Sequence, residues 1–132
     1  MLNNPTSGVK EPTAVKSLLV VEDDIDIGEF IVHAIQQETR YQAVLAIDAF
    51  KALNAIRARK PDMFLLDYQL PGMDGLELYN LLHTTEGLEN TPVLFMSANF
   101  SEKELDTLRL PYIEKPFELD DLLKEIENII EA

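Results

Sequence analysis

The apolar residues of this chain form short continuous runs, each followed by a segment in which apolar residues recur with a helical period. The runs are typical of strands that are covered on both faces, because they do not alternate with polar residues. They predict five strands: SLLVVE (17–22), YQAVLAI (41–47), DMFLLD (62–67), PVLFMS (92–97) and YIEK (112–115). Residues 1–16 are rich in Pro, Thr, Ser and Asn and have no hydrophobic period, so they are predicted to be a mobile tail.

An amphipathic segment follows each predicted strand. In the first, the residues at helical spacing predict the buried face of a helix: Ile27, Phe30, Ile31, Ala34 and Ile35. Asp48 is a plausible N-cap for the second helix, and Ser101 with Glu104 is the pattern of a capping box for the fourth. The remaining helices are predicted within 48–60, 75–85, 101–109 and 118–132, and the Leu and Ile residues of the last are assigned to the core.

Strands that alternate with helices across short connections predict a parallel sheet, because parallel neighbours need crossover connections. The fold class is therefore a doubly wound α/β domain with helices on both faces of the sheet, and residues 17–132 are predicted to form it. In such sheets ligands bind beyond the carboxyl ends of the strands. The residues that end each strand are thus the first candidates for a functional site.

Composition narrows the possible partners and compartments. The 132 residues fit one domain, and 24 acids against 11 bases give a formal charge of −13, which disfavours direct binding to nucleic acid or to an anionic membrane. The absence of cysteine excludes disulfides and thiolate sites. No apolar run approaches the roughly 20 residues of a membrane span, and no signal peptide is recognisable, so we expect a cytoplasmic protein.

Polar residues with complementary chemistry stand at the strand ends. The first strand ends in Glu22, Asp23 and Asp24, the third in Asp67, the fourth in Ser97, and the fifth in Lys115 followed by Pro116. Clustered carboxylates need a compensating cation, and Mg²⁺ takes oxygen ligands from one or two carboxylates while it keeps waters and substrate phosphate oxygens. A hydroxyl and a lysine supply the hydrogen bond and the positive charge that a phosphoryl group needs. The pattern predicts a phosphoryl-accepting carboxylate beside a metal ion.

With these residues in place, residues 17–131 resemble the receiver (response-regulator) domain of two-component phosphorelay signalling, here of a stand-alone type. The resemblance implies a flavodoxin-like sheet of order 2-1-3-4-5 and an acceptor, Asp67, that takes a phosphoryl group from a histidine kinase or a histidine phosphotransfer protein. The resemblance also implies that Mg²⁺ is held by Glu22, Asp23, Asp67 and the Gln69 backbone carbonyl, with Asp24 a weaker candidate. It implies that the phosphoryl group is contacted by Ser97 and Lys115, and that Tyr112 is the switch aromatic. The Lys115–Pro116 bond is expected to be cis.

The residues after the acceptor, LPGMDG (70–75), agree with this resemblance. Pro71 and Gly72 are expected to turn the chain away from Asp67, and Gly75 to let the next helix begin close by. The segment between Ser97 and Lys115 is shorter than is usual in receivers by about one helical turn, roughly 3.6 residues. We therefore expect a trimmed fourth helix and an altered output face. No residue follows Ala132, so no DNA-binding or enzymatic output domain is expected in this chain.

Simpler roles and other functions remain open from the sequence. The acids at 22–24 suit a helix N-terminus, Lys115 could be a surface lysine, Tyr112 a core aromatic, and Ser97 a loop hydroxyl. His33 and His83 are interpreted as structural or surface residues. The main alternative is a receiver-like binding module that works without phosphorylation. A Mg²⁺-dependent phosphohydrolase is less favoured, since Gln69 stands where such enzymes carry an acid/base Asp, and flavin binding is less favoured still because no phosphate loop follows the first strand.

Overall fold

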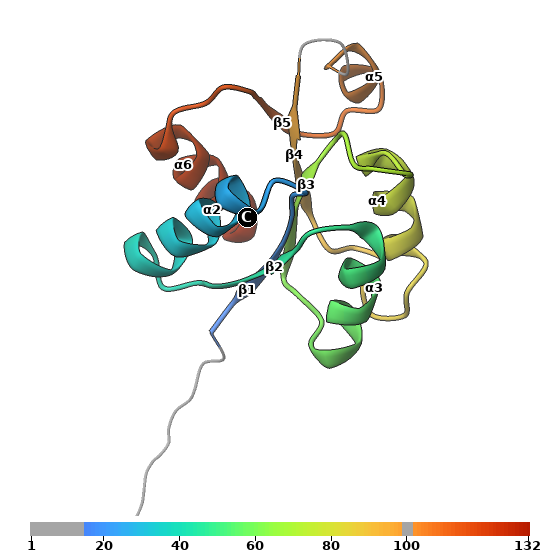
Figure 1. Ribbon diagram of the computed structural model, residues 1–132, viewed down its shortest axis with the longest axis horizontal. Helices are drawn as coiled ribbons and strands as arrows, with labels where there is room; N and C mark the ends of the chain where they lie inside the picture. Colours follow the sequence, from blue (N-terminus) through green and yellow to red (C-terminus); the bar gives the residue numbers. More distant parts are fainter. Residues whose placement is uncertain (1–14, 99–101) are drawn as a thin grey trace, which may run out of the picture.

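The computed structural model describes residues 15–98 and 102–132, and within them five parallel strands form one sheet in the order β2-β1-β3-β4-β5 (Figure 1). The strands are β1 (Ser17–Val21), β2 (Gln42–Ala46), β3 (Met63–Asp67), β4 (Val93–Ser97) and β5 (Tyr112–Glu114). The helices are α2 (Ile25–Glu38), α3 (Ala49–Ala58), α4 (Gly75–His83), α5 (Glu102–Thr107) and α6 (Leu119–Ile130). The predicted fold class and strand order are confirmed.

The helices cover the sheet in two layers. Helices α2 and α6 lie on one face, and α3, α4 and α5 lie on the other (Figure 1). Alternate residues of the central strands supply the two apolar cores: Leu18 and Val20 of β1 pack on the α2/α6 side, whereas Leu19 and Val21 pack on the other side. All five residues of β1, β3 and β4 are buried, which explains why these strands are continuous apolar runs in the sequence.

The buried face of α2 differs from the prediction. Ile31, Ala34 and Ile35 are buried, but Ile27 and Phe30 are exposed, Phe30 by 60% of its surface. Gly28 takes the inward position in the first turns instead, because a Cβ there would come within 2.6 Å of Leu45 Cδ1 on β2. The Leu45 side chain therefore fills the space beside Gly28, while Ile27 and Phe30 are exposed.

The helix ends follow local sequence signals in most places. Asp48 caps α3 by accepting a hydrogen bond from Lys51 N at 2.7 Å, as predicted. Asp74 and Glu77 form a capping box on α4. Of the capping box expected in the fourth helix, Ser101 lies outside the described residues. The Glu104 carboxylate accepts a hydrogen bond from the hydroxyl of Tyr68, which lies in the loop between β3 and α4.

Helix α5, the helix that the sequence predicts to be trimmed, has six residues. It ends in a Schellman motif, in which Arg109 N donates to Asp106 O and Leu110 N donates to Leu105 O, both at 3.0 Å. Arg109 occupies the left-handed position of this motif with φ of 58°. Helix α6 instead presents a regular apolar stripe, and the predicted core assignment of its Leu122, Ile126 and Ile130 is confirmed.

At the amino end, the sheet begins at Ser17 as expected. The boundary between a tail and a domain at residues 16 and 17 stays a prediction. Across the described ranges, every helix is too short or too polar to cross a membrane.

Candidate functional site

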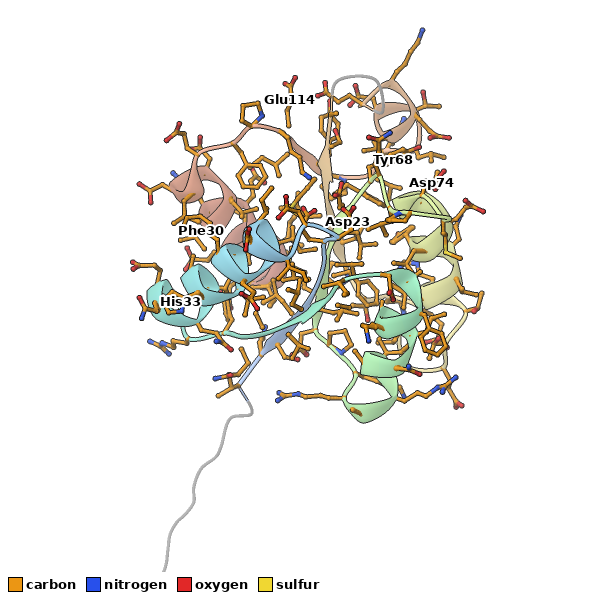
Figure 2. All side chains as sticks on the ribbon, viewed as in Figure 1. Asp23, Phe30, His33, Tyr68, Asp74 and Glu114 are labelled. Carbon is orange, nitrogen blue, oxygen red and sulfur yellow. The ribbon has the colours of Figure 1, made fainter. Side chains whose placement is uncertain are left out.

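The carboxyl edge of the sheet gathers polar side chains inside an otherwise apolar fold. Glu22, Asp67 and Ser97 are buried at the ends of β1, β3 and β4, where 6% or less of each residue is exposed. Asp23 is exposed beside them, and Figure 2 shows it near this edge. Burial of carboxylates costs free energy unless they are paired, so their partners decide what the site can do.

Lys115 bridges the two buried carboxylates. Its Nζ lies 3.2 Å from Glu22 Oε1 and 3.2 Å from Asp67 Oδ2. Burial lowers the pKa of Lys115, but the facing carboxylates of Asp67 and Glu22 raise it further, so the net pKa lies above its usual value and the ammonium stays charged. Burial, together with the nearby charge of Asp67, raises the pKa of Glu22 to about 7, although Asp24 N and Lys115 act in the opposite direction.

Glu22, Asp23 and Asp67 form the one group of three potential metal ligands found among the described residues. Each offers a carboxylate oxygen, and these oxygens lie within 4.8 Å of one another. Asp24, the weaker metal candidate, instead caps α2 by accepting a hydrogen bond from Ile27 N at 3.1 Å. The acids at 22–24 thus divide into a helix cap and members of the carboxylate group.

The loop after Asp67 is built as the sequence predicts. Gly72 has φ of +77°, which favours glycine in the Pro71-Gly72 turn. Gly75 begins α4 so close to β3 that a Cβ would come within 2.5 Å of Asp67 O. Gln69 N donates to Asp67 Oδ1 at 3.1 Å, so one oxygen of the Asp67 carboxylate is held against the loop that follows β3.

The remaining residues predicted for the site come from β4 and β5. Ser97 is buried, and its Oγ donates to Ala98 O at 3.3 Å. Lys115 N donates to Ser97 O at 2.8 Å, so the ends of β4 and β5 are tied together beside the lysine. The Lys115–Pro116 peptide bond is cis. Tyr112 packs partly buried against the core on the α5 side, and its interaction with Asp106 of α5 raises the pKa of its hydroxyl above the usual value.

Tyr68 is a residue of this region that the sequence analysis missed. It follows Asp67 directly, is 8% exposed, and its ring lies edge-on to Phe95 with centroids 6.1 Å apart. Its hydroxyl donates a hydrogen bond to Glu104 of α5, and Figure 2 shows Tyr68 on the side of the molecule that α5 covers. Burial and the Glu104 carboxylate raise the pKa of Tyr68 above its usual value. Its pattern in the sequence is that of an ordinary core aromatic, so no local signal could have shown this contact.

Both histidines lie away from the carboxylates. His33 is exposed on α2. His83 packs against Tyr79, with ring centroids 4.1 Å apart, and its Nε2 lies 2.9 Å from Thr91 O. Both agree with the interpretation as surface or structural residues.

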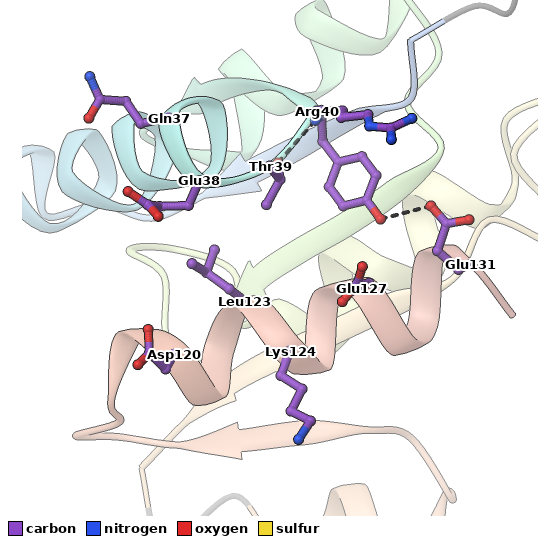
Figure 3. Close-up of a pocket in the computed structure, with 10 residues that line it drawn as sticks. Gln37, Glu38, Thr39, Arg40, Asp120, Leu123, Lys124, Glu127 and Glu131 are labelled. Atoms are coloured by element: carbon purple, nitrogen blue, oxygen red, sulfur yellow. Dashed lines mark hydrogen bonds between the residues drawn. The ribbon is translucent and has the colours of Figure 1, made fainter.

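A cleft of about 660 Å³ lies between the end of α2 and α6 (Figure 3), and it shares no lining residue with the carboxylate site. At its edge Tyr41 donates a hydrogen bond to Glu131 at 2.8 Å. Burial, together with this bond, raises the pKa of Tyr41 to about 12. The contact joins the start of β2 to the end of α6 and provides a second example of a buried tyrosine bound to a glutamate.

Known proteins share both the sequence pattern and the fold. The family model described as the response regulator receiver domain matches residues 18–127. The phosphate regulon transcriptional regulatory protein PhoB of Klebsiella pneumoniae is 33% identical over 119 residues, which are 87% of this chain and 52% of PhoB. The chain thus spans about half the length of this curated relative.

Solved structures agree with this match. The receiver domain of the Francisella response regulator 1452 superposes with a TM-score of 0.75 at 28% identity, over 88% of this chain and 97% of that one. The chemotaxis response regulator CheY4 of Vibrio cholerae has a TM-score of 0.78 over 87% of this chain and 98% of its own, and at 24% identity it supports the fold alone.

Proposed function

The chain belongs to the family of response regulator receiver domains, and from that premise we propose that it accepts a phosphoryl group on Asp67 from a phosphohistidine donor and thereby changes its affinity for a protein partner. The donor class is a histidine kinase or a histidine phosphotransfer protein. The observation that carries the proposal is the pairing of a buried acceptor carboxylate with Lys115 at 3.2 Å, next to two further acids.

The donor set suits a hard divalent cation such as Mg²⁺. Burial is the main cause that raises the pKa of Glu22 to about 7, and the charge of Asp67 adds to it, so a bound cation would favour the charged carboxylates of this group. Glu22, Asp23, Asp67 and the Gln69 backbone carbonyl would hold the ion. The ion would supply charge neutralisation for the oxygens of the transferring group.

The protein's own groups would then position and stabilise the transfer. An Asp67 carboxylate oxygen forms the new P–O bond while the P–N bond to the donor histidine breaks, and the bonding electron pair stays with the histidine nitrogen. Lys115, already charged and adjacent, neutralises negative charge on the phosphoryl oxygens. The contribution of the fold is therefore orientation and electrostatics, not a separate acid or base.

The conformational response to phosphorylation would start at Ser97, next to Asp67. Ser97 ends β4 beside the site, and its hydroxyl is bound only weakly to Ala98 O at 3.3 Å, so it can turn toward a phosphoryl oxygen. Lys115 N is bonded to Ser97 O, and Tyr112 begins the same strand β5, where it pairs with Phe95 of β4. Phosphorylation would therefore shift the population of β4–α5 and β5 conformations that a partner recognises.

Intact mass spectrometry tests the acceptor directly. The protein is incubated with acetyl phosphate, with and without Mg²⁺, as wild type, as Asp67→Asn, and as Asp26→Asn, an exposed acid of α2 that serves as the matched control. We expect one Mg²⁺-dependent phosphoryl adduct in wild type and in Asp26→Asn, and none in Asp67→Asn. A folded wild-type protein that neither binds Mg²⁺ nor takes the adduct would instead support a binding module that works without phosphorylation.

A further inference from the structure

Tyr68 follows Asp67 directly, and its backbone is held to the neighbouring strand β4 and to the start of α4. Its N donates to Met96 O at 2.9 Å, and its carbonyl accepts a hydrogen bond from Gly75 N at 2.5 Å. The start of α4 also packs tightly on this segment, because a Cβ at Gly75 would come within 2.8 Å of Tyr68 Cα. A change in the position of Asp67 or of the end of β4 must therefore reach the Tyr68 ring, which is buried against Phe95.

The Tyr68 hydroxyl is bound to Glu104 of α5, the described helix with the fewest buried apolar residues. Among the six residues of α5, only Leu105 is buried. A polar contact adds to this attachment, because Glu104 accepts a hydrogen bond from the Tyr68 hydroxyl. Glu104 is exposed, so water can replace Tyr68 as its partner at little cost if the bond is released.

α5 is also joined to the site through the chain itself. It begins at Glu102, five residues after Ser97 at the end of β4. Two routes thus lead from the acceptor to α5, one through Ser97 along the chain and one through the Tyr68–Glu104 hydrogen bond. If the segment that holds Asp67 and Tyr68 moves, the Tyr68–Glu104 hydrogen bond is kept only if α5 moves with it.

We propose that Tyr68 is a positioning residue that couples the state of Asp67 to α5, through a hydrogen bond to Glu104 that holds α5 on the sheet in the unmodified protein and is released on phosphorylation. The inference rests on the proposed phosphoryl-acceptor function. Because coupling is reciprocal, a partner that binds the released form of α5 would in turn favour the phosphorylated state.

Amide hydrogen exchange of α5, read together with intact mass, tests this coupling. In wild type we expect exchange in residues 102–108 to become about five- to tenfold faster on phosphorylation with acetyl phosphate and Mg²⁺, since one lost hydrogen bond is worth about that factor in local opening. In Tyr68→Phe, exchange should already be faster by a similar factor before phosphorylation. The phosphoryl adduct should still form, and the further change on phosphorylation should be lost.

Two sets of variants separate coupling from a loss of stability. Tyr41→Phe removes a hydrogen bond between an equally buried tyrosine and a glutamate at the far end of the molecule, so α5 should respond to phosphorylation as it does in wild type. Glu104→Ala should reproduce the effect of Tyr68→Phe without disturbing the core, and Glu104→Gln, whose amide oxygen can still accept, should restore much of the response. Lys103→Ala is the control for a substitution on an exposed position of α5.

The possible failures are distinguishable. If folded wild type neither binds Mg²⁺ nor takes the phosphoryl adduct, the proposed function is wrong and the coupling falls with it. If the adduct forms but α5 responds equally in wild type, Tyr68→Phe and Glu104→Ala, the coupling alone is overturned. Unchanged α5 exchange in unmodified Tyr68→Phe would also overturn it, because the hydrogen bond would then not hold the helix.

Discussion

Helices α5 and α6 cover opposite faces of the same β4–β5 side of the sheet, yet they are attached in different ways (Figure 1). α6 has twelve residues and buries Leu122, Ile126 and Ile130 along one stripe. α5 has six residues and buries Leu105. Each helix region also has a glutamate bound to a buried tyrosine, Glu131 to Tyr41 and Glu104 to Tyr68.

The difference shows which side of the fold can change at small cost. Apolar packing is lost only when a helix leaves the core, whereas a hydrogen bond to an exposed carboxylate can be exchanged for one to water. α6 is therefore suited to hold the sheet, and α5 is suited to respond to the site. Both helices stand beside strands that end in site residues, so proximity to Asp67 alone does not decide which of them moves.

The largest expected effect is the loss of stability when one buried apolar residue of α6 or of α5 is shortened to alanine. Ile126→Ala and Leu105→Ala remove the same number of carbon atoms from fully buried positions. For Ile126→Ala we expect the free energy of unfolding to fall by about 3 to 5 kcal/mol, because α6 cannot leave without exposing its whole stripe. For Leu105→Ala we expect a fall nearer to about 2 kcal/mol, because α5 can open locally and relieve the cavity.

Urea denaturation, together with amide exchange, measures this difference. In Leu105→Ala the amides of α5 should exchange rapidly while those of β1 and β3 stay protected. Equal losses of global stability, with α5 still protected in Leu105→Ala, would mean that α5 is as firmly fixed as α6 and would remove the basis of the comparison.

A smaller effect is expected for the two tyrosines. Tyr41→Phe and Tyr68→Phe each remove a hydrogen bond to a carboxylate and keep the ring, so each should lower stability by about 1 kcal/mol or somewhat more. In Tyr41→Phe the loss should appear in the global free energy of unfolding. In Tyr68→Phe it should appear mainly as faster exchange in α5. If both losses were purely global, the α5 contact would be structural only.

The sequence was sufficient to predict the sheet and the strand ends because both depend on local patterns. Continuous apolar runs predict strands buried on both faces, and the strand ends predict that Glu22, Asp67, Ser97 and Lys115 share one edge; the structure brings these side chains to that edge. The turn after Asp67 was predictable for the same reason, since Gly72 and Gly75 meet local backbone needs.

The features that the sequence did not predict depend on residues that are distant along the chain. Ile27 and Phe30 fit a helical stripe, but both are exposed, and Gly28 takes the inward position beside Leu45 of β2. Glu104 fits a capping box, but its carboxylate bonds to Tyr68, 36 residues earlier. The contrast between α5 and α6 could not be inferred from helix patterns alone, because it depends on what each helix meets on the sheet.

A modest gain in stability is expected at the end of α5. Arg109 has φ of 58° in the Schellman motif, a position where glycine avoids the cost of a side chain in left-handed backbone. Arg109→Gly should therefore stabilise the protein by about 0.5 to 1 kcal/mol, measured by thermal and urea unfolding. Arg59→Gly, at the extended C-cap of α3, is the control and should be destabilising or neutral. A loss of stability in Arg109→Gly would mean that the arginine side chain contributes more than its backbone position costs.

The smallest effect is expected from the pH dependence of α5. Burial of the Glu102 carboxyl, together with the neighbouring Glu114 and Asp106, raises its pKa above 4.5 in the folded chain. The folded state then binds more protons than the unfolded state between 4.5 and the raised pKa, so this group makes stability fall as pH rises through that interval. Glu102→Gln should remove this contribution, and its gain in stability over wild type should grow from pH 4.5 toward neutral pH. Urea unfolding across that range, with Glu125→Gln on α6 as the control for the loss of one exposed charge, measures the difference. A gain that does not change with pH would show that Glu102 titrates alike in both states, and the crowding of acids around α5 would then have no part in its weaker attachment.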